Sequence, residues 1–164
     1  MLPCDEDRVL RHSIEPFLDE VARRGSRLGG GSVAALSAAL SAALLEKLTV
    51  RPPQRRALQR IRRASTRLIR RDAETFARAV EAMRSDDPAA FRVSLRAATA
   101  VQETVRRHAR TVETACRAAQ RAIAPRFQSD LRCAAALAAA AQRSARALIR
   151  ANRAWLAQSR RRSR

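Results

Sequence analysis

The run Gly29-Gly30-Gly31-Ser32 is the part of this sequence best suited to contact a ligand. Glycine has no Cβ, so the chain can turn sharply there and a ligand can touch the backbone. A helix of small residues is predicted to follow, and the free N–H groups at its start favour an anionic or hydrogen-bonding ligand. Ser32 would cap this helix or donate to the ligand. The alternative is a flexible turn followed by a serine cap.

Asp72 is the second candidate, because its position predicts a buried carboxylate. It lies four residues after Leu68 and four before Phe76, so at helical periodicity it falls on an apolar stripe. A carboxylate there must be paired, protonated or functional, since burying a bare charge is costly. Arg70 and Arg71 are predicted to point away from the stripe. The structural alternative is therefore an ion pair with an arginine from another helix.

Three further polar residues lie where a helix packs or begins. Asn152 lies four residues after Leu148 and four before Leu156, which predicts a buried amide that satisfies a helix end or binds a substrate. Asp130 falls in the first turn of a predicted helix, where the dipole favours an acid, so the structural interpretation is the stronger one. His108 lies near an apolar face and is interpreted as a core histidine with a satisfied ring rather than as a catalyst.

Metal and nucleophile chemistry find little support. The three cysteines, Cys4, Cys116 and Cys133, have no CxxC spacing, and two histidines are too few for a convincing zinc site. We therefore predict no metal and no cofactor. Cys116 and Cys133 fall among apolar residues, which predicts buried thiols.

Five helices are expected to position these residues, and no strand pattern competes with them. The three longest, of about thirty residues each, suit an antiparallel bundle with short connections. The helix from Ser32 has small residues on every side, which predicts that it is buried all round. The fold prediction is an all-α antiparallel bundle of about five helices, with a buried Ala/Ser-rich helix following a Gly-rich loop. The expected ranges are 14–24 with Ser13 as N-cap, 32–48, from after Pro52-Pro53 to 84, from 88 with Asp87 as N-cap to before Pro125, and from after 129 to 158.

The length of 164 residues predicts one domain, placed at 1–158, with 159–164 as a basic disordered tail. The formal charge is +19, and every basic residue except Lys47 and the histidines is arginine. An anionic partner would explain this charge, and so would drift of surface lysines to arginine codons. No stacking aromatics are interleaved with the arginines, which disfavours a nucleic-acid platform. Residues 1–10 lack the apolar segment of a secretory signal and 33–45 is too short to span a bilayer, so we expect a cytoplasmic location and no membrane.

Several of these segments together resemble the cyclodeaminase/cyclohydrolase family of tetrahydrofolate enzymes. The resemblance begins at 13–22 and continues through the glycine motif at 29–36. The segment 71–76 is similar to the family's Asp-Ala segment, and Ser129-Asp130-Leu131 with Arg150-Ala151-Asn152 is similar to its C-terminal block.

The resemblance implies an all-helical homodimer that binds a folate-type small molecule in a cleft near the subunit interface. The implied reaction is closure of a formimino group with loss of ammonia, or hydrolysis of the methenyl bridge to formyl. Either reaction needs a proton donor or acceptor beside the one-carbon unit, a role that a carboxylate with a tuned pKa suits. Asp72 is the predicted catalytic residue. The predicted substrate-binding residues are Gly29, Gly30, Gly31, Ser32, Asp130 and Asn152.

This chain also departs from the family's pattern. Lys47 replaces an asparagine that is usual before the Leu-Thr pair, Gln102 stands where proline is usual, and Leu148 stands where the first of two asparagines is usual. The leading hypothesis is a tetrahydrofolate one-carbon enzyme. The alternatives are a catalytically silent homologue that binds an anion or a partner, and a basic helical bundle that binds nucleic acid.

Overall fold

The structure, a computed structural model, describes residues 13–162, with side chains described as far as 159. Cys4 and His12 lie outside this range. The described chain contains five α-helices, one short 3-10 helix and no strand, so the predicted all-α class is confirmed. The elements are α2 (Glu15–Ala22), α3 (Gly30–Leu48), α4 (Pro52–Arg84), α5 (Pro88–Ala119), η2 (Pro125–Phe127) and α6 (Gln128–Arg162).

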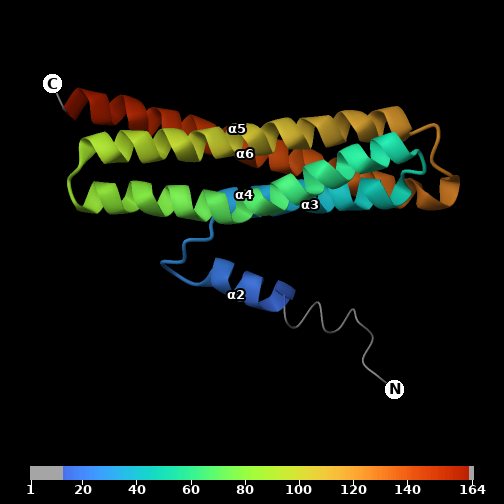
Figure 1. The fold of residues 1–164 in the computed structure, drawn as a ribbon, viewed down its shortest axis with the longest axis horizontal. Helices are drawn as coiled ribbons and strands as arrows, with labels where there is room; N and C mark the ends of the chain where they lie inside the picture. The colour runs from blue at the N-terminus through green and yellow to red at the C-terminus, as the bar shows by residue number, and fades with distance from the viewer. Residues whose placement is uncertain (1–12, 163–164) are drawn as a thin grey trace, which may run out of the picture.

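Helices α3 to α6 form an up-and-down bundle in which each helix packs against the next one in sequence, and α3 also packs against α6 (Figure 1). The prolines explain the boundaries, because Pro52 and Pro88 occupy first-turn positions where the missing N–H costs nothing. The predicted cap Asp87 is confirmed, since its Oδ1 accepts hydrogen bonds from the backbone N–H groups of Ala89 and Ala90. In contrast, α2 lies outside the bundle and none of its residues is buried (Figure 1).

The core lies along α3, where small side chains allow the neighbouring helices to approach closely. Ala35, Ala38 and Ala42 are fully buried, and Ser41 donates a 2.7 Å hydrogen bond to the carbonyl oxygen of Ala134 in α6. By length and composition alone α3 would suffice to cross a membrane, but 56% of its most apolar window is buried inside the bundle. This burial is what a core helix requires.

The helices of the bundle differ in length, and this difference shapes the molecule. Helix α3 has 19 residues, whereas α4, α5 and α6 have 33, 32 and 35. The three long helices therefore continue past the N-terminus of α3, as Figure 1 shows. The side chains that face this shortened position have no fourth helix to cover them.

Four local predictions need correction. Helix α3 begins at Gly30, two residues earlier than expected, and it is not buried all round, because Val33 and Leu40 are 38% and 46% exposed. Ser13 does not cap α2, which starts at Glu15 without a side-chain cap. Cys133 is exposed rather than buried, because it lies on the outer face of α6.

Candidate functional site

Asp72 is a residue of α4, and its buried carboxylate lies beside the N-terminus of α3. Two side chains from other helices hold it. Asp72 is 7% exposed. Its Oδ1 accepts a 2.6 Å hydrogen bond from Nε2 of Gln102 in α5, and its Oδ2 accepts a 3.1 Å bond from the Ser32 hydroxyl in α3. The alternative interpretation, an ion pair between Asp72 and an arginine of another helix, is not found among the described salt bridges, and Arg70 pairs with Glu74. Asp72 is therefore a buried acid with neutral partners.

Gly31 is the glycine that this arrangement requires. A Cβ on Gly31 would lie 2.2 Å from Oδ1 of Asp72 and 2.4 Å from Nε2 of Gln102, which are impossible contacts. A Cβ on Gly30 would meet its nearest atom at 3.9 Å, and one on Gly29 would meet nothing within 4 Å. The glycine run therefore serves a close approach of side chains to the α3 backbone at Gly31, while the backbone of Gly29 and Gly30 is exposed.

Burial raises the pKa of the Asp72 carboxyl above its usual value, and hydrogen bonds from Gln102 and Ser32 counter this only in part. The carboxylate also receives a hydrogen bond from the backbone of Ser32, in the first turn of α3, where the helix dipole favours a negative charge. Burial and hydrogen bonding thus act in opposite directions, and burial prevails. A carboxyl in this situation can change protonation state near neutral pH more readily than an exposed one.

Ser32 does not act as the predicted N-cap. Gly29 occupies the cap position, with no side-chain cap, and Ser32 lies inside the first turn. The Ser32 hydroxyl has acceptors at 3.1 Å in both Asp72 Oδ2 and the carbonyl oxygen of Ile69. Because a hydroxyl carries one hydrogen, these two bonds are alternatives, and the hydroxyl can release Asp72 without losing its own partner.

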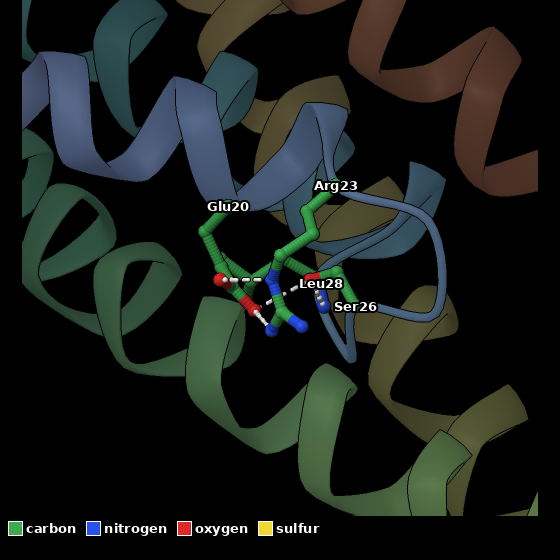
Figure 2. A network of polar contacts seen from close by, with 4 residues as sticks. All are labelled: Glu20, Arg23, Ser26 and Leu28. Carbon is green, nitrogen blue, oxygen red and sulfur yellow. Dashed lines mark hydrogen bonds and ion pairs between the residues drawn. The ribbon is translucent and has the colours of Figure 1, made fainter.

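The connection from α2 to α3 is organised by a small polar network, which Figure 2 shows. The Glu20 carboxylate accepts hydrogen bonds from Arg23 at 2.6 Å and from Ser26 at 2.8 Å, and the Ser26 hydroxyl oxygen accepts one from the backbone N–H of Leu28 at 3.0 Å. The hydrogen bond from Arg23, and to a smaller extent the one from Ser26, lowers the pKa of Glu20. Gly25, with φ of +79°, makes the turn that a side chain would strain. The network directs the chain into the start of α3.

Helix α6 contributes Leu148 and Asn152 on one face. Leu148 Cδ2 lies 3.9 Å from the point where a Gly30 Cβ would be, so α6 packs against the glycine start. Asn152 is one helical turn further on the same face and is 7% exposed, which confirms that it is buried. Three of the predicted features therefore lie near the N-terminal end of α3: the glycine run, Asp72 of α4 and Asn152 of α6.

Asp130 belongs to the other end of α3. It lies in the first turn of α6, as expected, and its carboxylate is 3.5 Å from Nζ of Lys47. Lys47 is fifteen residues beyond Ser32 on α3, a separation of about 22 Å along the helix. Within one chain, Asp130 is therefore remote from Asp72.

His108 and Cys116 have structural surroundings. Nδ1 of His108 lies 3.0 Å from the Ser65 hydroxyl, so the ring has a partner, and burial, with the charge of Arg107 as a smaller cause, lowers its pKa. Cys116 is buried as predicted, and burial, aided by the charge of Glu113, raises the pKa of its thiol to about 11. Neither residue is poised as a nucleophile.

Sequence reasoning missed the part that Gln102 plays. Gln102 is 1% exposed, and it lies on the same stripe as the buried residues Ala98, Val105 and Ala109. The pattern that identified Asp72, a polar residue on an apolar face, was thus present in α5 too. The Oε1 atom of Gln102 is buried without a hydrogen-bond partner in the described structure. The approach of the Phe76 and Phe91 rings to Trp155, each with its centroid 6.4 Å from that of the tryptophan, was also not predicted.

The chain resembles known proteins over nearly its whole length. The sequence profile of the formiminotransferase-cyclodeaminase family matches residues 13–163. A crystal structure of formiminotetrahydrofolate cyclodeaminase from Thermotoga maritima has the same fold, with a TM-score of 0.78, 21% identity and coverage of 90% of this chain and 85% of that chain. No curated protein matches the sequence. Because the profile spans all the helices described above, the chain belongs to the formiminotransferase-cyclodeaminase family.

Proposed function

We propose that this protein is a tetrahydrofolate one-carbon enzyme, which cyclises formimino-tetrahydrofolate with release of ammonia or hydrolyses methenyl-tetrahydrofolate. The observation that carries the proposal is the Asp72 carboxyl, buried between three helices and held by Gln102 and Ser32 rather than by a counter-charge. The family to which the chain belongs supports a folate derivative as the substrate.

Asp72 would transfer the proton in either reaction. In the cyclisation, the N10 amine adds to the formimino carbon, and its proton must reach the departing nitrogen before ammonia leaves. In the hydrolysis, a water molecule adds to the cationic methenyl carbon; one of its protons reaches the ring nitrogen that is released as the bridge opens, and the other passes to solvent. One carboxyl can accept the proton in the first half of each reaction and return it in the second. A raised pKa brings its two protonation states closer in free energy at neutral pH.

The backbone at Gly29 and Gly30 and the amide of Asn152 are the proposed substrate contacts. The two glycines are exposed and leave the start of α3 accessible, so an anionic or carbonyl group can approach the free N–H groups there. Asn152 offers both a donor and an acceptor on the adjacent face of α6. Asp130, about 22 Å from this point along α3, would contact the substrate only if a second subunit brought it to the site.

Two assays on the purified protein test the proposal. One follows the loss of methenyl absorbance from methenyl-tetrahydrofolate, and the other follows its appearance from formimino-tetrahydrofolate. We expect Asp72→Asn to lower the catalysed rate by about 10²- to 10⁴-fold. Glu74→Gln is the matched control, because Glu74 lies two residues away on α4 and is exposed in a pair with Arg70. If neither assay shows conversion above that in buffer, the proposed activity on tetrahydrofolate derivatives is excluded. An unchanged rate in Asp72→Asn would remove Asp72 from the mechanism.

A catalytically silent homologue is the second candidate, and one contact favours it. Leu148 brings an apolar side chain to within 3.9 Å of the Cβ position of Gly30, where an asparagine is usual in the family that the sequence resembles. A polar substrate group at the glycine start would gain nothing from this side chain. If both assays are negative, restoration of activity by Leu148→Asn would identify this residue as the lost function.

We also propose that the protein is a homodimer. Among the described residues, α2 and α3 both carry exposed apolar side chains: Leu18 of α2 is 54% exposed, and Val33 and Leu40 lie on one exposed face of α3. A second copy would cover both. Light scattering after size exclusion should give twice the chain mass of 18.2 kDa, and Leu40→Glu should shift the protein to 18.2 kDa.

A further inference from the structure

A pocket of about 480 Å³ lies where α3 ends, α4 begins and α5 ends, and these three helix ends meet at one end of the bundle (Figure 1). We call it the distal pocket. Its volume is within the range of about 300 to 1,000 Å³ that small-molecule sites occupy. Leu45 in its wall is thirteen residues beyond Ser32 on α3, about 20 Å along the helix, so the pocket is separate from the Asp72 site.

The walls of the distal pocket are apolar and continuous with the hydrophobic core. Leu45 and Leu58 line it, are 1% and 5% exposed, and belong to one core cluster, against which Ile61 packs. The wall at the end of α5 is made largely of alanines, whose side chains are too short to fill the space, namely Ala115, Ala118, Ala119 and Ala122. An apolar group placed between these walls would be removed from water on several sides, which is favourable.

The lining offers few free polar groups. Oγ1 of Thr49 donates a 2.7 Å hydrogen bond to the carbonyl oxygen of Leu45, and Oγ1 of Thr111 donates a 3.1 Å bond to that of Arg107. Both hydroxyl hydrogens are thus used within the chain. Water in the pocket would find few partners, and an apolar group that displaces poorly bonded water gains affinity. Val50, which is 91% exposed, adds an apolar side chain that such a ligand would cover.

Arg51 is the one charged residue among the described residues that line the distal pocket. It is exposed and forms no ion pair within the part of the chain that the structure describes. Pro52 and Pro53 follow it and carry no N–H, so the first turn of α4 lacks two of the backbone donors that hold anions at other helix starts. The Arg51 guanidinium is therefore the group that would receive an anion, and a carboxylate matches two of its parallel donors.

The charge around the pocket also favours an anion over a cation. Arg55 and Arg56 follow on α4 and are exposed, and the described lining contains no carboxylate. Glu46, near the end of α3, is already paired with Arg62 at 2.8 Å. The formal charge of +19 adds a field that raises the local concentration of anions.

We infer that the distal pocket binds an amphiphilic monocarboxylate, with its apolar body between Leu45, Leu58 and Ile61 and its carboxylate on Arg51. The lining matches one negative charge and no more, because a second carboxylate would lie among apolar walls without a partner. The inference does not depend on the proposed function, since neither Asp72 nor the glycine run lines this pocket.

Isothermal titration calorimetry of the full chain with octanoate tests the inference. We expect saturable binding of octanoate, weaker binding of octan-1-ol and the weakest binding of octylammonium, since only the first has both the apolar body and the negative charge. Arg51→Gln should weaken octanoate binding about tenfold, the value of one hydrogen bond between charged groups, and leave octan-1-ol binding unchanged. Arg60→Gln is the matched control, because Arg60 is an exposed arginine of α4 outside the lining.

A second variant tests the cavity itself. Ala115→Leu places a larger side chain in the pocket and should abolish octanoate binding, while both residues favour a helix. Ala100→Leu is its control, since Ala100 is exposed on the same helix and does not line the pocket. Circular dichroism spectra of the two variants show whether the bundle is retained.

The result is independent of turnover, because Asp72→Asn should bind octanoate as the wild type does, whatever the folate assays show. Absence of saturable octanoate binding to the wild type would overturn the inference. Equal affinities of the wild type and Arg51→Gln, or of octanoate and octan-1-ol, would overturn it as well. If the wild type does not bind octanoate and Val50→Glu reduces the mass in light scattering to that of one chain, a second copy covers the pocket instead of a ligand.

Discussion

Nε2 of Gln102 lies 2.6 Å from Oδ1 of Asp72, and both side chains are buried. The other end of the same amide, Oε1, has no partner among the described residues. An amide offers both a donor and an acceptor. After a rotation of the amide, Gln102 could therefore accept a hydrogen bond from protonated Asp72 as well as donate one to the carboxylate. This pairing stabilises the acid without fixing its protonation state.

Replacement of Gln102 by methionine should raise the pKa of Asp72 further, because the donor that opposes the effect of burial is lost. A ¹³C NMR titration of the aspartate carboxyls, compared with Asp72→Asn for assignment, measures this directly and needs no turnover. The activity of an active enzyme should fall about tenfold, the value of about one hydrogen bond to a charged group. Gln142→Met is the control, because Gln142 is a buried glutamine that donates to Glu113 instead. A titration of Asp72 that is the same in both variants would contradict this interpretation.

Alanine substitutions along the glycine run should have unequal effects. Gly31→Ala forces a Cβ into Asp72 and Gln102 and should destabilise the protein by about 1–3 kcal/mol, the cost of overpacking. Gly30→Ala meets only an ordinary contact at 3.9 Å and should be neutral within about 1 kcal/mol, since alanine favours the helix. Urea unfolding measures both. Equal losses at the two positions would show that the contact at Gly31 is relieved by movement of the helices.

The free energy of unfolding of Asp72→Asn, relative to that of the wild type, should increase as the pH rises. The folded state raises the pKa of Asp72, so folding favours the protonated acid, and the wild type loses stability as the pH increases from below 3.8 through the folded-state pKa. Each unit of pKa difference corresponds to about 1.4 kcal/mol. His108, whose pKa is lowered, acts in the opposite sense and costs stability as the pH falls below 6.5.

The comparison that isolates Asp72 is the difference in unfolding free energy between Asp72→Asn and the wild type at several pH values, since His108 contributes equally to both. Glu74→Gln controls for the loss of one negative charge, because Glu74 is an exposed carboxylate on the same helix. A difference that does not grow with pH would mean that burial does not govern the titration of Asp72.

Thiol reagents should distinguish Cys133 from Cys116. Cys133 is exposed, whereas Cys116 is buried with a thiol pKa of about 11, so almost none of it is thiolate at neutral pH. Mass spectrometry of the native protein after iodoacetamide should find the Cys133 peptide labelled and the Cys116 peptide unlabelled until denaturant is added. Comparable labelling of both peptides in the native protein would show that the α5–α6 core opens.

Much of the fold follows from local signals in the sequence. Pro52, Pro88 and the Asp87 cap determine where α4 and α5 start, because helix initiation depends on neighbouring residues alone. Helical periodicity placed Asp72 and Asn152 on buried faces, since the position of a residue around a helix depends only on its spacing from its neighbours. These are properties of single helices, and they were predicted correctly.

Which residues make up the site depends on which helices pack together and on the level along their axes at which they contact each other. Gly31, Asp72 and Gln102 come from three helices, and periodicity gives the face of each helix but not the level at which it crosses another. For the same reason, Asp130 shares the family's pattern with Asn152, yet within one chain it lies at the opposite end of α3. The uncovered end of the bundle, with Phe91 and Trp155 beside it, exists because a 19-residue helix packs among three that are much longer. Packing between distant segments, which local sequence does not encode, brought these residues together.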